Sequence, residues 1–147
     1  MTRISTIGFT QKTAEHFFGL LQRERVRAVV DVRLNNISQL AGFAKRDDLR
    51  FFLRNVVDAD YVELKELAPS SSILKAYQSK SLSWDVYAEK YLEELARRAV
   101  ERNIEKENLD GCCLLCSEHS PERCHRRLAL DYLVGVWGDG VEIKHLL

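Results

Sequence analysis

The 147-residue chain lacks any uninterrupted apolar segment of the roughly 20 residues that a helix needs to cross a bilayer. Its first eight residues are too short and too polar to form the hydrophobic part of an export signal. Because neither a membrane span nor an export signal is evident, we expect a cytoplasmic protein with no membrane partner.

The chain also lacks an excess of charge of either sign, because 22 basic residues balance 22 acidic ones. The balance is uneven along the chain, with ten basic and five acidic residues in positions 1–57. No basic tail or run of Lys and Arg is present, so nucleic-acid binding through this basic third remains only an alternative. A basic surface of this size also suits a small anionic ligand. Nothing in the sequence indicates the oligomeric state.

The chain also lacks glycine-rich phosphate loops, and it holds only seven glycines. No G-x-G-x-x-G or G-x-x-x-x-G-K-[ST] motif occurs, which excludes the standard dinucleotide and triphosphate loops. The stretch from Cys116 to Arg123 reads Cys-x6-Arg and contains no glycine. Its length and composition therefore differ from the anion-cradling loops of phosphatases and rhodaneses.

What the chain does have is a regular alternation of strand-like and helix-like segments. Thr13 is a suitable N-cap for a first helix, and the apolar residues after it recur at helical spacing. The longest expected helix spans residues 83–102, and the last begins around Pro121 and ends at Trp137. Residues 34–45 and 68–72 are expected to be loops. Strands are expected at residues 3–7, 27–33, 60–64, 111–116 and 142–146.

This alternation predicts one α/β domain over residues 1–147, with a three-layer, Rossmann-like architecture. The sheet should be mostly parallel, with helices on both faces. Ligands of such sheets bind beyond the carboxyl ends of the strands. Two predicted strands end in reactive residue types, Asp31-Val32-Arg33 and Cys116-Ser117-Glu118.

Cys124, His125 and Arg126 belong to the expected first turns of the last helix. The backbone N–H groups at a helix start favour anions and lower the pKa of a nearby thiol, and arginine acts in the same direction. His125 shares the apolar stripe of this helix and should face the sheet. There it is either an acid or base near Glu118 or a hydrogen-bonded core histidine.

Four cysteines, at positions 112, 113, 116 and 124, leave three interpretations open. The first is a metal site built from Cys113, Cys116, Cys124 and His125. Residues three apart in a strand face opposite sides, which argues against that set, so we assign no metal and leave any cofactor undetermined. The second is a redox pair of Cys116 and Cys124. The third is nucleophilic catalysis by either of these two cysteines.

The ordered motifs of the chain resemble the domain of unknown function 488 family. They are Thr6-Ile7-Gly8, Val30-Asp31-Val32-Arg33, Gly42-Phe43, Tyr61-Val62 with Glu66-Leu67, and the Cys116-Ser-Glu…Pro121-Glu-x-Cys124-His125-Arg126 box. The resemblance implies an α/β fold of unassigned activity. It also implies a joint site formed by Asp31, Arg33, Cys116, Glu118, Cys124, His125 and Arg126.

Two positions depart from the family pattern. Members often have histidine after Thr-Ile-Gly, where this chain has Phe9, and a second histidine in the third strand, where it has Glu63. A metal or proton relay that depended on those histidines is therefore not expected here.

Together these observations predict a thiol-dependent enzyme that acts on a small anionic substrate such as a nucleotide. Its catalytic residues would be Cys116, Glu118, Cys124 and His125, and its substrate-binding residues Asp31, Arg33 and Arg126. The alternative is a non-catalytic module that binds an anion, a nucleotide or nucleic acid and whose cysteines are structural.

Overall fold

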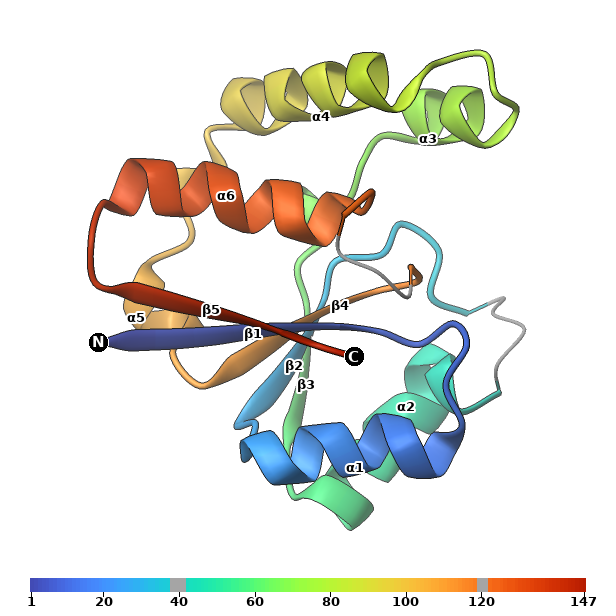
Figure 1. The fold of residues 1–147 in the computed structure, drawn as a ribbon, viewed down its shortest axis with the longest axis vertical. Coiled ribbons are helices and arrows are strands. Elements are labelled where there is room, and N and C mark those ends of the chain that lie inside the picture. The colour runs from blue at the N-terminus through green and yellow to red at the C-terminus, as the bar shows by residue number, and fades with distance from the viewer. Residues whose placement is uncertain (38–41, 119–121) are drawn as a thin grey trace.

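The computed structural model describes residues 1–37, 42–118 and 122–147, and within them five strands form one sheet (Figure 1). The strand order is β3-β2-β4-β1-β5, and each neighbouring pair is parallel. The expected α/β class with a parallel sheet is confirmed. The strands are β1 (Thr2–Gly8), β2 (Ala28–Asp31), β3 (Asp60–Glu63), β4 (Cys112–Cys116) and β5 (Val141–Leu146).

Helices cover both faces of the sheet, which confirms the three-layer arrangement (Figure 1). On one face lie α1 (Ala14–Glu24) and α2 (Arg46–Phe52), which continues as a wider turn over Leu53–Val57. On the other face α6 (His125–Trp137) packs on the sheet, and α4 (Trp84–Arg98) packs on α6. Two shorter helices are α3 (Ser71–Gln78), which contacts α4, and α5 (Lys106–Leu109).

The residues of β4 alternate between two hydrophobic cores. Cys112, Leu114 and Cys116 belong to the core beneath α6 and α4, whereas Cys113 and Leu115 belong to the core beneath α1 and α2. Because all five residues are buried, β4 has the continuous apolar sequence expected of a central parallel strand.

Local capping explains where two of the predicted helices begin and end. Thr13 accepts a hydrogen bond from the His16 N–H at 3.1 Å, as expected of the N-cap of α1. The longest helix ends at Arg98 instead of residue 102, because Ala99 adopts a left-handed conformation and a short 3₁₀ turn follows.

Two further local expectations were wrong. Residues 68–72 were expected to be a loop, but α3 begins at Ser71 and buries none of its residues fully, so the apolar pattern gave little signal. The last long helix begins at His125, later than expected, because the backbone of Cys124 is extended. Pro121, proposed for its first turn, lies outside the described residues.

The connections that follow β1 and β4 diverge at the carboxyl ends of these strands. The chain leaves β1 towards α1 on one face and leaves β4 towards α6 on the opposite face, although β1 and β4 are neighbours. Adjacent strands with diverging connections open a crevice at their carboxyl ends. At that edge Gly8 pairs with Cys116, and Asp31 pairs with Leu115.

Among the described residues, no helix is long and apolar enough to span a bilayer.

Candidate functional site

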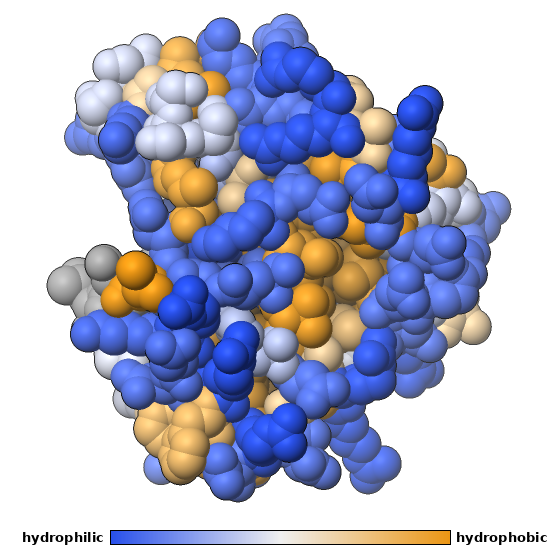
Figure 2. Space-filling model, turned by 180° about the vertical axis from the view of Figure 1, so that it is seen from behind, coloured by the Kyte–Doolittle hydropathy of each residue, from blue (hydrophilic) through white to orange (hydrophobic). Residues whose placement is uncertain are grey.

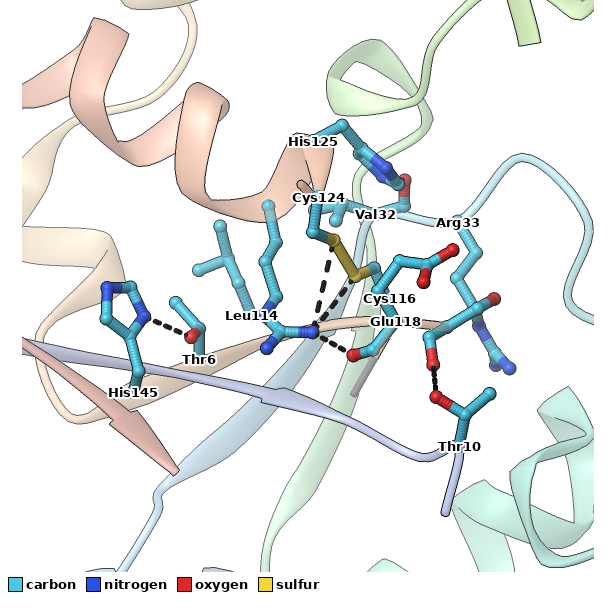
Figure 3. The surroundings of a disulfide bond; sticks show 12 residues. Thr6, Thr10, Val32, Arg33, Leu114, Cys116, Glu118, Cys124, His125 and His145 are labelled. Carbon is cyan, nitrogen blue, oxygen red and sulfur yellow. Dashed lines mark hydrogen bonds between the residues drawn. A yellow bond between two sulfur atoms is a disulfide. The ribbon is translucent and has the colours of Figure 1, made fainter. Parts of the chain in front are cut away.

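A disulfide at the crevice joins Cys116, the last residue of β4, to Cys124, the residue before α6 (Figure 3). The side chains are almost inaccessible, with exposed fractions of 0% and 2%. The predicted proximity of these two sulfurs is therefore present, whereas Cys112 and Cys113 remain free and buried. Cys113 lies on the opposite face of β4, so it cannot join Cys116 at a shared site.

The guanidinium of Arg126 is fully buried against this disulfide. Its Nη1 lies 3.2 Å from Cys116 Sγ and 3.9 Å from Cys124 Sγ, and it also donates to the backbone carbonyl of Glu118. Burial lowers the pKa of Arg126 to about 10, while Cys113 and Glu118 act in the opposite direction. Arg126 therefore remains positively charged at neutral pH, next to both sulfurs.

Backbone packing around Gly8 fixes the position of Arg126. A Cβ at Gly8 would overlap the Glu118 carbonyl oxygen and would lie 2.6 Å from Arg126 Nη1. Thr10, two residues later, donates from its backbone N–H and its hydroxyl to the carbonyl of Ser117, at 3.2 and 2.7 Å. The segment after β1 thus holds the segment after β4. The sequence offered Gly8 only as part of a family motif.

Lys12 adds a second basic group near Arg126, and sequence reasoning did not identify it. Burial, and secondarily the charge of Arg126, lower the pKa of Lys12 to about 8. Two cations whose charges interact make the region electropositive, which favours negative charge on any ligand or thiol there.

His125, the first residue of α6, faces the sheet as its helical position predicted. Its Nε2 lies 2.8 Å from the carbonyl oxygen of Val32, which can only accept a hydrogen bond, so Nε2 carries the proton. The ring also packs edge-on against Tyr91. Burial lowers the pKa of His125 to about 4, which outweighs the hydrogen bond to Val32. The imidazole is therefore neutral at pH 7, and its Nδ1 carries a lone pair.

Asp31 and Arg33 form a buried ion pair behind the crevice. The Nε and Nη2 of Arg33 each donate to one carboxylate oxygen of Asp31 at 2.8 Å, and both residues are at most 2% exposed. The guanidinium also lies over the ring of Phe9, 5.5 Å from its centre. Within the described part of the chain, no hydrogen-bond partner contacts Arg33 Nη1. Phe9 thus packs against the cation of Arg33.

Three further side chains complete a polar cluster at the ends of β2 and β3. The Tyr61 hydroxyl donates to Asp31 at 2.5 Å, and Asn36 donates to Glu63 at 2.6 Å. Burial and the hydrogen bond to Asp31 raise the pKa of Tyr61, so its hydroxyl remains a donor. Sequence reasoning missed Tyr61 and Asn36. No sequence signal pointed to them, because the pairing of Asp31 with Glu63 in adjacent strands becomes visible only in the structure.

A cavity of about 270 Å³ opens at the carboxyl ends of β2 and β4. Four predicted site residues line it: Arg33, Cys116, Glu118 and His125. From behind, the outline of the molecule is indented at the left, between α3 above and the segment after β2 below (Figure 2). The remaining walls come from Leu34, Asn35, Leu74, Gln78 and Ser117.

A larger cavity of about 480 Å³ lies at the opposite, amino-terminal end of the strands. Acidic and basic side chains alternate around it, and its cysteine, Cys112, accepts a hydrogen bond from Arg27 at 3.2 Å. We assign the candidate site to the smaller cavity, because parallel sheets bind ligands at the carboxyl ends of their strands.

The sulfurs of Cys116 and Cys124 and one ring nitrogen of His125 lie within 4.8 Å of one another. This is close enough to share a metal ion, and no other such group of three occurs in the ranges that the structure describes. The positive charge of Arg126, 3.2 Å from Cys116 Sγ, works against a cation. The same charge favours a thiolate, so the geometry suits thiol chemistry better than metal binding.

The seven predicted site residues thus form two adjoining groups, one that lines the cavity and one that lies behind its wall. Four line the cavity, Cys124 and Arg126 contact the sulfur of Cys116, and Asp31 lies behind Arg33. The Glu118 side chain is exposed, and its backbone carbonyl contacts Arg126.

Comparisons with known proteins agree with the sequence resemblance. The family model described as "Domain of unknown function DUF488" matches residues 13–133, which include most of the site but not Gly8 or Phe9. Neither the curated proteins nor the solved structures contain a match to this chain. Since the family model covers well over half of the 147 residues, the chain belongs to the DUF488 family.

Proposed function

We propose that the protein is a thiol-dependent enzyme that acts on a small anionic substrate in the cavity at the end of β4. The observation that supports this most strongly is the contact between Arg126 Nη1 and Cys116 Sγ at the wall of that cavity. A buried guanidinium next to a sulfur stabilises the thiolate, which is the nucleophilic form of cysteine.

In the reduced protein, the Cys116 thiol loses its proton to His125 Nδ1 or to solvent. The thiolate forms a bond to an electrophilic carbon or phosphorus atom while the bond from that atom to the leaving group breaks. The leaving group departs with the electron pair and takes up a proton. Water, deprotonated by Glu118, then attacks the adduct and releases the thiolate, so the net reaction is a hydrolysis.

The anionic character of the substrate is inferred from Arg33 and Arg126. Arg33 has a guanidinium nitrogen without a partner among the described residues and lines the cavity, while Asp31 fixes its orientation. At about 270 Å³ the cavity is slightly smaller than typical sites for drug-sized ligands, roughly 300–1,000 Å³. It therefore suits a small anion, or the phosphate end of a nucleotide rather than the whole nucleotide.

Two alkylating reagents of similar size test the thiol and the anion preference together. In the reduced protein, iodoacetate, which is anionic, should modify Cys116 faster relative to neutral iodoacetamide than it modifies a free cysteine. One additional hydrogen bond of about 1 kcal/mol corresponds to a preference of roughly fivefold. Peptide mass spectrometry resolves Cys116 from the other three cysteines.

The Arg33→Lys variant should lose most of this preference, because lysine can pair with Asp31 but lacks the second guanidinium nitrogen. Arg127→Met is the matched control, since Arg127 pairs with Asp131 on the outer side of α6. Absence of alkylation of Cys116 in the folded, reduced protein would rule out the enzyme. An unchanged reagent ratio in Arg33→Lys would rule out the role of Arg33.

The disulfide also favours a second candidate, a non-catalytic anion-binding module in which Cys116 and Cys124 are structural. This candidate predicts that phosphate or adenosine monophosphate binds equally well to the oxidised and reduced protein, as measured by calorimetry. It also predicts that Cys116 is inert to both alkylating reagents. Binding of DNA or RNA that weakens steeply with salt would instead support the nucleic-acid alternative.

A further inference from the structure

The two sulfurs of the disulfide lie in different surroundings. Cys116 lines the cavity at the end of β4, whereas Cys124 is not among the residues that line it. Because both side chains are almost fully buried, a thiol on the surface of another protein cannot reach either sulfur directly. A small thiol in the cavity would meet Cys116 first.

Cys124 is placed to be the better leaving group. It is the N-cap residue of α6, a helix of 13 residues, and its own side chain makes no capping hydrogen bond. A thiolate at a helix N-terminus is stabilised by these N–H groups and by the helix dipole. Arg126 Nη1, 3.9 Å from Cys124 Sγ, adds a positive charge. Thiols of lower pKa leave faster in disulfide exchange.

We propose that this disulfide is a reversible redox centre that a low-molecular-weight thiol opens by attacking Cys116, with Cys124 leaving. The incoming thiolate forms a bond to Cys116 Sγ, the bond between the two cysteine sulfurs breaks, and Cys124 departs as the thiolate. A second thiolate then attacks the incoming sulfur and releases Cys116 as a thiolate. Two thiols are oxidised to one small disulfide, and the protein gains two electrons.

Arg33 adds selectivity, because it lines the same cavity and its buried Nη1 has no partner in the described part of the chain. The preferred reductant should therefore be a thiol that carries a carboxylate. Exchange with the other two cysteines is not expected. Cys113 lies on the opposite face of β4, and Cys112 lies at the other end of that strand, next to Arg27.

This inference does not depend on the hydrolytic function, since disulfide exchange requires no other substrate. If Cys116 showed no anion preference towards alkylating reagents but still exchanged with thiols, the proposed function would fail and the redox centre would stand. If Cys116 showed the anion preference but did not exchange with thiols, the redox centre would fail and the proposed function would stand.

Trapping of the mixed disulfide tests which sulfur is attacked. In the Cys124→Ser variant, Cys116 has no partner sulfur. The disulfide of mercaptoacetate should therefore form a stable adduct on Cys116. In Cys116→Ser, the adduct on Cys124 should form at least about tenfold more slowly. Cys112→Ser and Cys113→Ser are matched controls and should form the internal disulfide as the wild type does. Intact and peptide mass spectrometry after acid quenching measure all four variants.

In the wild-type protein, mercaptoacetate should reduce the disulfide faster than neutral 2-mercaptoethanol after correction for thiolate concentration. Faster adduct formation on Cys124 than on Cys116 would overturn the assigned direction of attack. Resistance of the folded wild-type disulfide to both thiols, with reduction only after unfolding in urea, would show a structural crosslink and overturn the proposal.

Discussion

At the scale of single residues, the narrowest steric constraint at the site falls on Gly8. This glycine has ordinary strand geometry, so backbone conformation is not the reason for its identity. The reason is close approach, because the Glu118 carbonyl occupies the place where a Cβ would lie. That carbonyl in turn accepts a hydrogen bond from Arg126. A backbone contact thus positions Arg126. Within the described part of the chain, its guanidinium is the only one that contacts the sulfur of Cys116.

The Gly8→Ala substitution should therefore destabilise the protein by about 3 kcal/mol or more. This is the upper end of the range of unfolding free energies lost when a side chain is added to a fully packed position. It should also slow the alkylation of reduced Cys116, because Arg126 must shift. Gly135→Ala is the matched control, since a Cβ at Gly135 in α6 meets nothing within 4 Å. There alanine should raise stability by roughly 0.5–1 kcal/mol. Urea denaturation measures both changes, and equal stabilities of the two variants would contradict this account.

At the scale of elements, the ends of β2 and β3 are joined by a polar network instead of apolar packing. Asp31 accepts hydrogen bonds from Arg33 and Tyr61, and its negative charge balances the positive charge of Arg33. Burial acts to raise the pKa of Asp31, but the hydrogen bonds and charge of Arg33 and the bond from Tyr61 bring it below its ordinary value. The carboxylate is therefore ionised throughout the neutral range.

The Asp31→Asn substitution should destabilise the protein by about 3–5 kcal/mol, because it leaves the buried Arg33 without a counter-charge. Asp47→Asn breaks the exposed pair with Arg46 and should cost less than about 1 kcal/mol. Thermal and urea denaturation of both variants at pH 7 give the comparison. A loss below 1 kcal/mol in Asp31→Asn would mean that the ion pair contributes little.

The sequence was informative about elements where apolar periodicity was strong. The five strands and the long helices α1, α4 and α6 follow from such patterns, and β4 shows the expected alternation of faces. It was uninformative where tertiary contacts decide the conformation. α3 has no fully buried residue, and the start of α6 depends on the extended backbone of Cys124.

The candidate site followed from sequence only in part. Residues that end strands or begin helices, such as Arg33, Cys116 and His125, could be placed at one edge from the alternation of elements alone. Tyr61, Asn36 and Lys12 could not, because their participation depends on strand order and loop paths. The order β3-β2-β4-β1-β5 inserts β4 between β1 and β2, and local patterns do not encode that insertion.

At the scale of the whole molecule, the site lies where three parallel strands end and their connections diverge. β1 supplies Gly8, β2 supplies Asp31, and β4 supplies Cys116, while α6 brings His125 and Arg126 from the face on which Cys116 lies. His125 connects this arrangement to global stability, because its ring is neutral in the fold and bonded to Val32.

Acid should therefore destabilise the protein through His125. Its pKa is about 4 in the folded protein and about 6.5 when unfolded, so the stabilisation is complete above pH 6.5 and is lost as the pH falls towards 4. The loss is on the order of 3 kcal/mol, since the pKa differs by about 2.5 units and one unit corresponds to about 1.4 kcal/mol.

The His125→Gln variant should show a flatter decline of unfolding free energy between pH 6.5 and 4 than the wild type. His16→Gln is the control, because His16 is exposed on α1. His145, whose pKa is also lowered by burial, keeps part of the decline in both variants. Parallel pH curves for His125→Gln and the wild type would refute the assignment.

The central claim is that Arg126 activates the sulfur of Cys116, and the pH dependence of Cys116 alkylation in the reduced protein tests it most directly. We expect the alkylation rate to follow a titration clearly below the ordinary cysteine value of about 8.5, and to move upward in Arg126→Met but not in Arg127→Met. A midpoint at or above 8.5 in the wild type, or one that Arg126→Met leaves in place, would contradict the claim.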